Sequence, residues 1–226
     1  MPDQDYKLDN PIWYALAESH KHLCYDFENI KFYHPDYCCF GAFNKNNDYQ
    51  DGIEKYSNLT DNFYIVGQEP KLPDHLYINK EIVCFQMLLN KLNYESFSPI
   101  ITPLKSDNYS ALFNLVQMVM PGYIREKTPL MGKFYGIFEK DHLIAAAGKR
   151  MHLEDYTEVS SIVTHPSHLR KGYASALTHY CGQEILNEQK KAFLHVLDTN
   201  SAAIDLYSKI GFQIRRRMTF WNIKHK

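Results

Sequence analysis

The 226-residue sequence lacks the features that mark a membrane-bound or secreted protein. Its N-terminus has neither a basic start nor a long apolar run, and no apolar stretch elsewhere approaches the ~20 residues that a membrane-spanning helix needs. The five cysteines include no CxxC pair, and an odd number of thiols suits a reducing compartment better than a disulfide framework. We therefore expect a cytoplasmic protein.

The sequence also lacks an excess of charge of either sign. Lys and Arg total 25 against 26 for Asp and Glu, so the net charge of −1 gives no general attraction to nucleic acid or to an anionic membrane. We interpret the run Arg215–Arg217 as a solvated strand edge. The closely spaced histidines (His20 with His22, His165 with His168) have no cysteine or carboxylate at ligand spacing, so we predict no metal site.

The composition is otherwise that of an ordinary globular protein, with 45% hydrophobic and 23% charged residues. The polar segment Asn90–Pro99 is the best candidate for a domain boundary, and seven of the ten glycines follow it. We predict an N-terminal α+β domain over residues 1–97 and a second domain over 98–226. Residues 1–90 show no recognisable spacing of nucleophile, base and orienting group, so the chemistry is expected in the second domain.

Hydrophobic periodicity and turn residues predict the elements of both halves. The first half is expected to contain a helix over 11–22, β-runs at 30–33, 38–43 and 63–66, a short helix near 52–59 and a mixed apolar run at 81–89. The second half is expected to contain a helix over 106–120, a hairpin at 134–138 and 142–148, strands at 156–164 and 192–197, helices at 172–187 and 201–210, and a final pair of β-runs within 212–223. This order predicts a mixed α/β domain whose sheet is mostly covered.

The stretch Tyr156–Ala174 leads from an apolar, β-branched run through a turn at Pro166 into a basic loop, Arg170–Gly172, and then a helix. The first turn of a helix has unpaired N–H groups and the positive end of the helix dipole, which together favour a phosphate. A glycine lets such an anion approach the backbone. The pattern alone fits a phosphate site or an ordinary strand-to-helix turn.

Two motifs in this half resemble a known family. Leu169–Ala174 is similar to the Q/R-x-x-G-x-G/A loop of the GNAT superfamily of N-acyltransferases, with Gly172 and Ala174 matching and Leu169 in the first, usually polar, position. Further on, Asn200–Phe212 resembles the family pattern N-x-x-A-x-x-L-Y-x-x-x-G-F. The resemblance covers roughly residues 100–226 and implies a GNAT-like fold there. The N-terminal half would be an addition to that fold, or a decayed copy of it.

The resemblance implies an acyl-CoA site, with acetyl-CoA as the simplest donor. In the family, the strand before the loop diverges from its neighbour and offers backbone groups to the pantetheine arm, while the loop and helix start hold the pyrophosphate. For Asn200, a simple helix N-cap is an equal alternative to pantetheine binding. The residues implied in binding are Ile162, Val163, Thr164, Leu169, Arg170, Lys171, Gly172, Tyr173, Ala174, Asn200 and Ala203.

The resemblance also implies two catalytic residues. Tyr207 would be the acid that protonates the departing thiolate, a transfer uphill by about 2 kcal/mol at reference pKa values; the alternative is a tyrosine packed in the core. Glu158, 14 residues before Gly172, would be the base that takes a proton from the amine, with a pKa raised by burial; the alternative is an outward-facing carboxylate. Strand alternation predicts that Glu158, Ser160 and Ile162 share one face.

The function implied is transfer of an acetyl group from acetyl-CoA to an unidentified primary amine, by direct attack in a ternary complex. No nucleophilic cysteine is needed, and Cys181 is expected to be packed. The alternative is a catalytically inactive acyl-CoA-binding sensor or interaction module. A different acyl donor is a third possibility, because the loop recognises only the shared CoA part.

Overall fold

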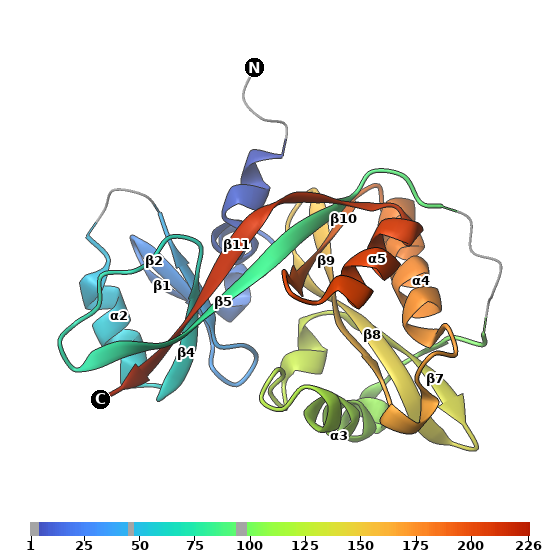
Figure 1. The fold of residues 1–226 in the computed structure, drawn as a ribbon. Helices are drawn as coiled ribbons and strands as arrows, with labels where there is room; N and C mark the ends of the chain where they lie inside the picture. Colours follow the sequence, from blue (N-terminus) through green and yellow to red (C-terminus); the bar gives the residue numbers. More distant parts are fainter. Residues whose placement is uncertain (1–4, 45–47, 94–98) are drawn as a thin grey trace. The chain divides into compact units, whose positions relative to one another are not determined.

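The computed structural model describes residues 5–44, 48–93 and 99–226 (Figure 1). Their contacts divide the chain into two compact units, Met1–Cys84 with Arg217–Lys226, and Phe85–Arg216. The division thus falls after Cys84, inside a strand, and returns the last ten residues to the first unit. The predicted boundary segment includes residues 94–98, which lie outside the described residues, and a domain boundary at residue 97 stays a prediction.

The first unit contains a short mixed sheet and two helices. Its strands are ordered β1-β2-β3-β4-β11, where β11 is Phe212–His225, with β3 and β4 parallel and the other pairs antiparallel. The elements are α1 (Pro11–Ala17), β1 (Cys24–Phe27), β2 (Ile30–Tyr33), β3 (Phe40–Phe43), α2 (Gln50–Ser57) and β4 (Asn62–Val66). The prediction that the first helix reaches His22 is wrong. The chain leaves the helix after Ala17, and His20 is buried with its Nδ1 2.9 Å from the Tyr33 hydroxyl.

The second unit holds the strands and helices of the predicted catalytic half. Its strand order is β5-β10-β9-β8-β7-β6, where β5 is Leu76–Leu89, with β11 beside β5. The elements are β6 (Thr102–Pro103), α3 (Tyr109–Val119), β7 (Lys133–Glu139), β8 (His142–His152), β9 (Tyr156–Thr164), α4 (Tyr173–Asn187), β10 (Lys191–Leu197) and α5 (Ser201–Ile210). The predicted hairpin is present, closed by Lys140 and Asp141 at positive φ. Strands β9 and β10 are parallel, and β8 pairs antiparallel with β7 and β9.

Two long strands, β5 (Leu76–Leu89) and β11 (Phe212–His225), contribute residues to both units. The prediction of two β-runs at the end of the chain is therefore wrong. Residues 213–221 contain none of the glycine, proline, asparagine or aspartate residues that favour a turn, so nothing in the local sequence interrupts the strand. The longer β5 likewise extends the run predicted at 81–89 towards its N-terminus.

Helices cover both faces of the sheet in the second unit, which confirms the predicted mixed α/β class. Leu177, Cys181 and Ile185 of α4 pack in one core with residues of β8, with alternate residues of β10 and with α5. The predicted stripe of α3, including Leu112, Leu115 and Val116, packs in a second core. Ala145, Ala146 and Ala147 of β8 alternate between these cores, whereas the adjacent Ile144 and Ala145 lie in the same core, where the register with β7 shifts. None of the described helices combines the length and the apolar character needed to span a membrane.

Strand β9 has an irregularity that changes which residues share a face. Gly148 pairs with Ser160, but Ala146 pairs with Val163, so β9 holds one extra residue here, and Ser161 adopts φ 54°. This is a β-bulge, which shifts the alternation beyond it. Ile162 packs against the α4 core and Val163 lies in the α3 core. The prediction that Ile162 shares a face with Glu158 and Ser160 is therefore wrong.

Candidate active site

The start of α4 forms a cradle of backbone N–H groups. Gly172 is the N-cap residue at φ 78°, and Arg170 also has a positive φ of 62°. Within the described chain, no hydrogen bond from the backbone N–H of Arg170, Lys171, Gly172 or Ala174 is present. Left-handed residues on either side of Lys171, just before a helix start, turn several N–H groups towards one side, which suits an anion. The loop fits the pyrophosphate that the sequence motif implies.

Strands β9 and β10 are paired only at their beginnings. Their register runs from Tyr156 opposite Lys191 to Glu158 opposite Phe193 and then stops. Beyond Glu158, β9 remains paired to β8, where Ala146 and Ala145 face Val163 and Thr164, but not to β10. The edge of β9 that faces away from β8 is therefore available over residues 159–164 to an extended ligand, as the predicted pantetheine site requires. Binding by Ile162, Val163 and Thr164 stays a prediction.

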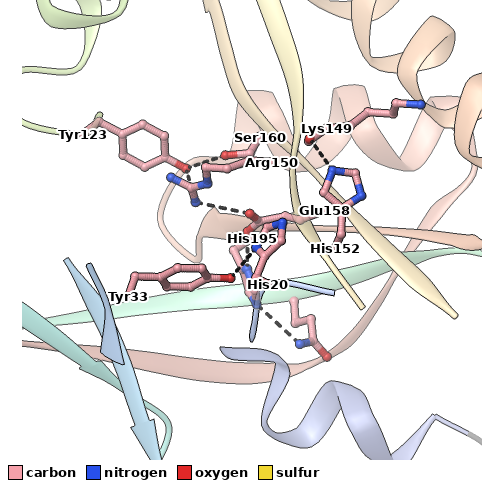
Figure 2. Close-up of polar contacts among 10 residues, drawn as sticks. His20, Tyr33, Tyr123, Lys149, Arg150, His152, Glu158, Ser160 and His195 are labelled. Atoms are coloured by element: carbon pink, nitrogen blue, oxygen red, sulfur yellow. Dashed lines mark hydrogen bonds and ion pairs between the residues drawn. The ribbon is translucent and has the colours of Figure 1, made fainter. Parts of the chain in front are cut away.

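Glu158 is a buried carboxylate at the last paired position of β9. Its side chain is held between two partners, the Arg150 guanidinium on β8 and the His195 imidazole on β10 (Figure 2). Arg150 Nη2 lies 3.2 Å from Oε2, and His195 Nδ1 lies 2.9 Å from Oε1. Burial raises the pKa of Glu158, but the charge of Arg150 and the hydrogen bond of His195 outweigh it and hold the pKa below its usual range. The predicted burial-raised pKa is therefore wrong.

A second layer of polar contacts fixes the orientation of His195. Arg215 Nη1 donates to Gln86 Oε1 at 3.1 Å, and Gln86 Nε2 lies 3.3 Å from His195 Nε2. Because the amide oxygen is occupied by Arg215, the amide nitrogen donates to Nε2. The proton of the neutral imidazole is then on Nδ1, where it is donated to Glu158.

On the other side, the network continues through Arg150 to Tyr123, in the connection between α3 and β7. The Arg150 guanidinium lies 5.0 Å from the centre of the Tyr123 ring, and the Tyr123 hydroxyl is 3.1 Å from Ser160 Oγ. These residues join β8, β9 and the α3–β7 connection on one face of the sheet (Figure 2). Sequence reasoning missed Arg150, His195 and Tyr123, because none of them belongs to a motif.

Tyr207 lies on α5, 9% exposed, in the same core as Phe212. Burial raises the pKa of its phenol, and the nearby Tyr123 raises it further. The hydroxyl therefore stays protonated at neutral pH, as an acid or hydrogen-bond donor requires. Tyr207 is thus packed in the core, as one interpretation of the sequence expects, and its phenol is protonated, as the role of an acid requires. The catalytic role stays a prediction.

The remaining motif residues have structural positions of their own. Asn200 is the N-cap of α5, and its side chain accepts the N–H of Ala203 at 3.1 Å, so the helix-cap interpretation is confirmed. Leu169 is 58% exposed, and Tyr173 packs against the α4 core. Cys181 is fully buried, and burial raises the pKa of its thiol to about 12, so it is packed as expected. Among the described residues, no cluster of three or more His, Cys, Asp or Glu side chains could hold a metal ion.

Comparisons with known proteins agree with this geometry. Residues 134–221 match the family described as FR47-like protein. A GNAT-family protein from Novosphingobium aromaticivorans DSM 12444 is similar in structure with a TM-score of 0.86 and 25% identity, over 98% of this chain and 100% of that chain. A GCN5-related N-acetyltransferase from Kribbella flavida is similar with a TM-score of 0.63 and 14% identity, over 100% of this chain and 96% of that chain.

A GCN5-related N-acetyltransferase-like protein from Streptococcus suis 89/1591 shares the fold with a TM-score of 0.65 and 11% identity, over 98% of this chain and 96% of that chain. Among curated proteins, the comparison gives no match. The family match covers the hairpin, the bulged strand, the cradle and α5, which are the elements that build the site. This match and the shared fold make the chain similar to acetyltransferases of the GNAT family.

Proposed function

We propose that the protein is an N-acetyltransferase that moves an acetyl group from acetyl-CoA to a primary amine by direct attack in a ternary complex. One observation carries the proposal: in a single unit, the unpaired edge of β9 begins beside a buried ionised carboxylate and leads along the chain to the N–H cradle of α4. The first feature suits an extended arm, the second a proton transfer and the third a pyrophosphate. The similarity to GNAT acetyltransferases supports the same conclusion.

The chain's own residues fit acyl-CoA at both ends. The N–H groups of Arg170–Ala174 would hold the pyrophosphate, with the basic side chains of Arg170 and Lys171 beside it. The free edge of Ile162–Thr164 would hold the pantetheine arm. When bound, acyl-CoA supplies an activated acyl group as a thioester. Residues of β9, β10 and α5 would orient the acceptor amine and move protons.

Two groups are proposed to move those protons. Tyr207, whose raised pKa keeps its phenol protonated, donates a hydrogen bond or a proton to the leaving sulfur. Glu158, ionised at neutral pH, accepts the proton of the amine, and His195 at 2.9 Å stabilises the carboxylate and keeps it oriented. Arg150 neutralises the buried charge between turnovers. Most of the rate is expected from holding donor and acceptor in the correct orientation.

The test is the rate of CoA release from acetyl-CoA over a panel of amines. We expect Tyr207→Phe to lower kcat by about 10²- to 10⁴-fold, the usual range for a positioned acid or base. Its unfolding midpoint should change little, because the hydroxyl has no hydrogen-bond partner in the described chain. Tyr180→Phe is the matched control, since Tyr180 packs against the same core from α4. Unchanged turnover in Tyr207→Phe would remove the acid from the mechanism.

One observation favours the alternative of an acyl-CoA-binding module without catalysis. Both oxygens of Glu158 are engaged by the protein, and its lowered pKa makes it a weak base. Calorimetry that shows tight binding of acetyl-CoA, with no transfer to any amine, would select this alternative. Comparing acetyl-, succinyl- and longer acyl-CoA in the same assay would identify the donor.

A further inference from the structure

Two hydroxyls of β9 are buried without a partner. Ser161 is 2% exposed, and within the described chain neither its Oγ nor the Oγ1 of Thr164 has a hydrogen-bond partner. Other buried hydroxyls of the same unit are bonded: Ser160 contacts Tyr123 at 3.1 Å, and Thr178 donates to the Ala174 carbonyl at 2.7 Å. Buried polar groups are nearly always paired in native proteins, because an unmade hydrogen bond is costly. The two hydroxyls therefore need an explanation.

Both hydroxyls lie in the part of β9 that is not paired with β10. The register between these strands ends at Glu158, and Ser161 and Thr164 follow it. The missing partner of each hydroxyl and the missing partner of the strand thus occur in the same segment. A ligand that binds along this segment in place of β10 would pair with the strand edge and would lie next to both residues.

Ser161 carries a second unfavourable feature. It is the extra residue of the bulge, with φ 54°, in the left-handed region that side chains other than glycine rarely adopt. Glycine would relieve the backbone and alanine would remove the unpaired hydroxyl. Strain kept at a residue that folding does not need is typical of binding and catalytic sites.

The order of the site along the chain indicates which part of a ligand each hydroxyl meets. From the cradle at Gly172, the chain runs back to Thr164, then Ser161, then the carboxylate of Glu158. A strand advances about 3.3 Å per residue, so Ser161 lies roughly 10 Å nearer to Glu158 than Thr164 does. Acyl-CoA runs in the same order, from the pyrophosphate through the pantetheine arm to the thioester.

We propose that the Ser161 hydroxyl donates a hydrogen bond to the thioester carbonyl of bound acyl-CoA. The inference rests on the proposed function. A thioester carbonyl only accepts hydrogen bonds, and a serine hydroxyl can donate one. The bond strengthens as negative charge develops on that oxygen during attack by the amine, so Ser161 both selects the acylated ligand and stabilises the reacting carbonyl.

The experiment is calorimetric titration of the parent protein and Ser161→Ala with CoA and, separately, with acetyl-CoA. We expect Ser161→Ala to bind CoA as the parent does and acetyl-CoA roughly three- to tenfold more weakly, which is the effect of one hydrogen bond. Its unfolding midpoint should be unchanged or higher, since a buried unpaired hydroxyl is removed. Ser161→Gly, which suits φ 54°, should show the same selective loss.

Ser160→Ala is the matched control, because it removes the neighbouring hydroxyl, which the protein itself satisfies. It should keep the parent's ratio of the two affinities. Equal weakening of CoA and acetyl-CoA in Ser161→Ala would overturn the assignment to the acyl carbonyl. So would unchanged affinities with a lower unfolding midpoint, which would make the hydroxyl structural. A parent that binds neither ligand would refute the proposed function itself, whereas a parent that binds both with an unchanged ratio in Ser161→Ala would refute only this inference.

Discussion

The two halves of β9 differ in whether the protein itself provides hydrogen-bond partners for their buried polar side chains. In Tyr156–Ser160, the strand starts between two neighbours, and both carboxylate oxygens of Glu158 are engaged by side chains from β8 and β10. In Ser161–Thr164, the strand is paired with β8 but not with β10, and two buried hydroxyls lack a partner in the described chain. The buried side-chain polar atoms of the first half are therefore paired without a ligand, whereas these two hydroxyls of the second half are not.

Because of this difference, the first half of β9 is expected to contribute mainly to the stability of the fold and the second half mainly to ligand binding. A buried polar group that the protein itself pairs contributes to the stability of the folded state, and removing one partner leaves the other buried and unpaired. A buried polar group that the protein leaves unpaired costs stability until a ligand pairs it. Substitutions of the paired groups in the first half should therefore lower the stability of the fold, whereas those in the second half and the cradle should act mainly on ligand affinity.

The largest expected effect comes from Glu158→Gln. This change removes the carboxylate charge that lies 3.2 Å from the buried guanidinium of Arg150, and breaking a buried ion pair costs about 3–5 kcal/mol of unfolding free energy. Urea unfolding at neutral pH measures it. The control is Glu139→Gln, which removes a carboxylate that is 51% exposed and should change stability little. Equal stability of Glu158→Gln and the parent would show that this half of β9 is not held by its charges.

Acid should reproduce part of that loss in the parent protein. Because the pKa of Glu158 is lower in the folded chain than its ordinary value of 4.5, its charge stabilises the fold above pH 4.5. This stability is lost as the pH falls through the folded pKa. The effect is smaller than that of the substitution, since a neutral carboxyl still forms hydrogen bonds. Urea unfolding measured between pH 7 and 3 should show the unfolding free energy of the parent approaching that of Glu158→Gln. A difference in unfolding free energy that stays constant with pH would contradict the lowered pKa.

Gly172→Val tests the cradle. Valine is strongly disfavoured at φ 78°, so the substitution should distort the start of α4 and lower CoA affinity by at least about tenfold. Leu169→Ala should change the affinity by less than about twofold, because the Leu169 side chain is exposed and the N–H groups hold the anion. Calorimetry with CoA measures both. The reverse ranking would mean that side chains rather than backbone groups bind the ligand.

The smallest expected effect is that of Asn200→Ala. It removes the cap of α5 and should cost about 1 kcal/mol of unfolding free energy. CoA affinity should stay within about twofold of the parent, because a cap that contributes about 1 kcal/mol stabilises the start of the helix without contacting the ligand. Asn200→Ser, which preserves a capping oxygen, should recover most of the stability. A large loss of CoA affinity with normal stability would instead show that Asn200 binds the pantetheine arm.

Local signals in the sequence were sufficient for much of the second unit. The predicted helix over 201–210 matches α5, because Asn200 caps its start and Gly211 follows its end. The predicted helix over 172–187 and the hairpin strands differ from the structure by a few residues at most. Errors occurred where distant contacts overrode local preference, as at α1, which ends early and is followed by the buried His20.

Sequence alone determined the motif residues of this protein: the basic glycine loop, the helix after it and the Asn200–Phe212 segment, whose shapes follow from local caps, turns and periodicity. Tertiary structure decided the surroundings of Glu158, because Arg150 and His195 reach it from neighbouring strands and reverse the effect of burial on its pKa. It also decided the bulge at Ser161, since an extra residue in a strand shows only against its partner. The spacing of residues in a sequence reports on contacts between neighbours along the chain. Strand pairing and the charge state of a buried group depend on residues that are distant in the sequence but close in space.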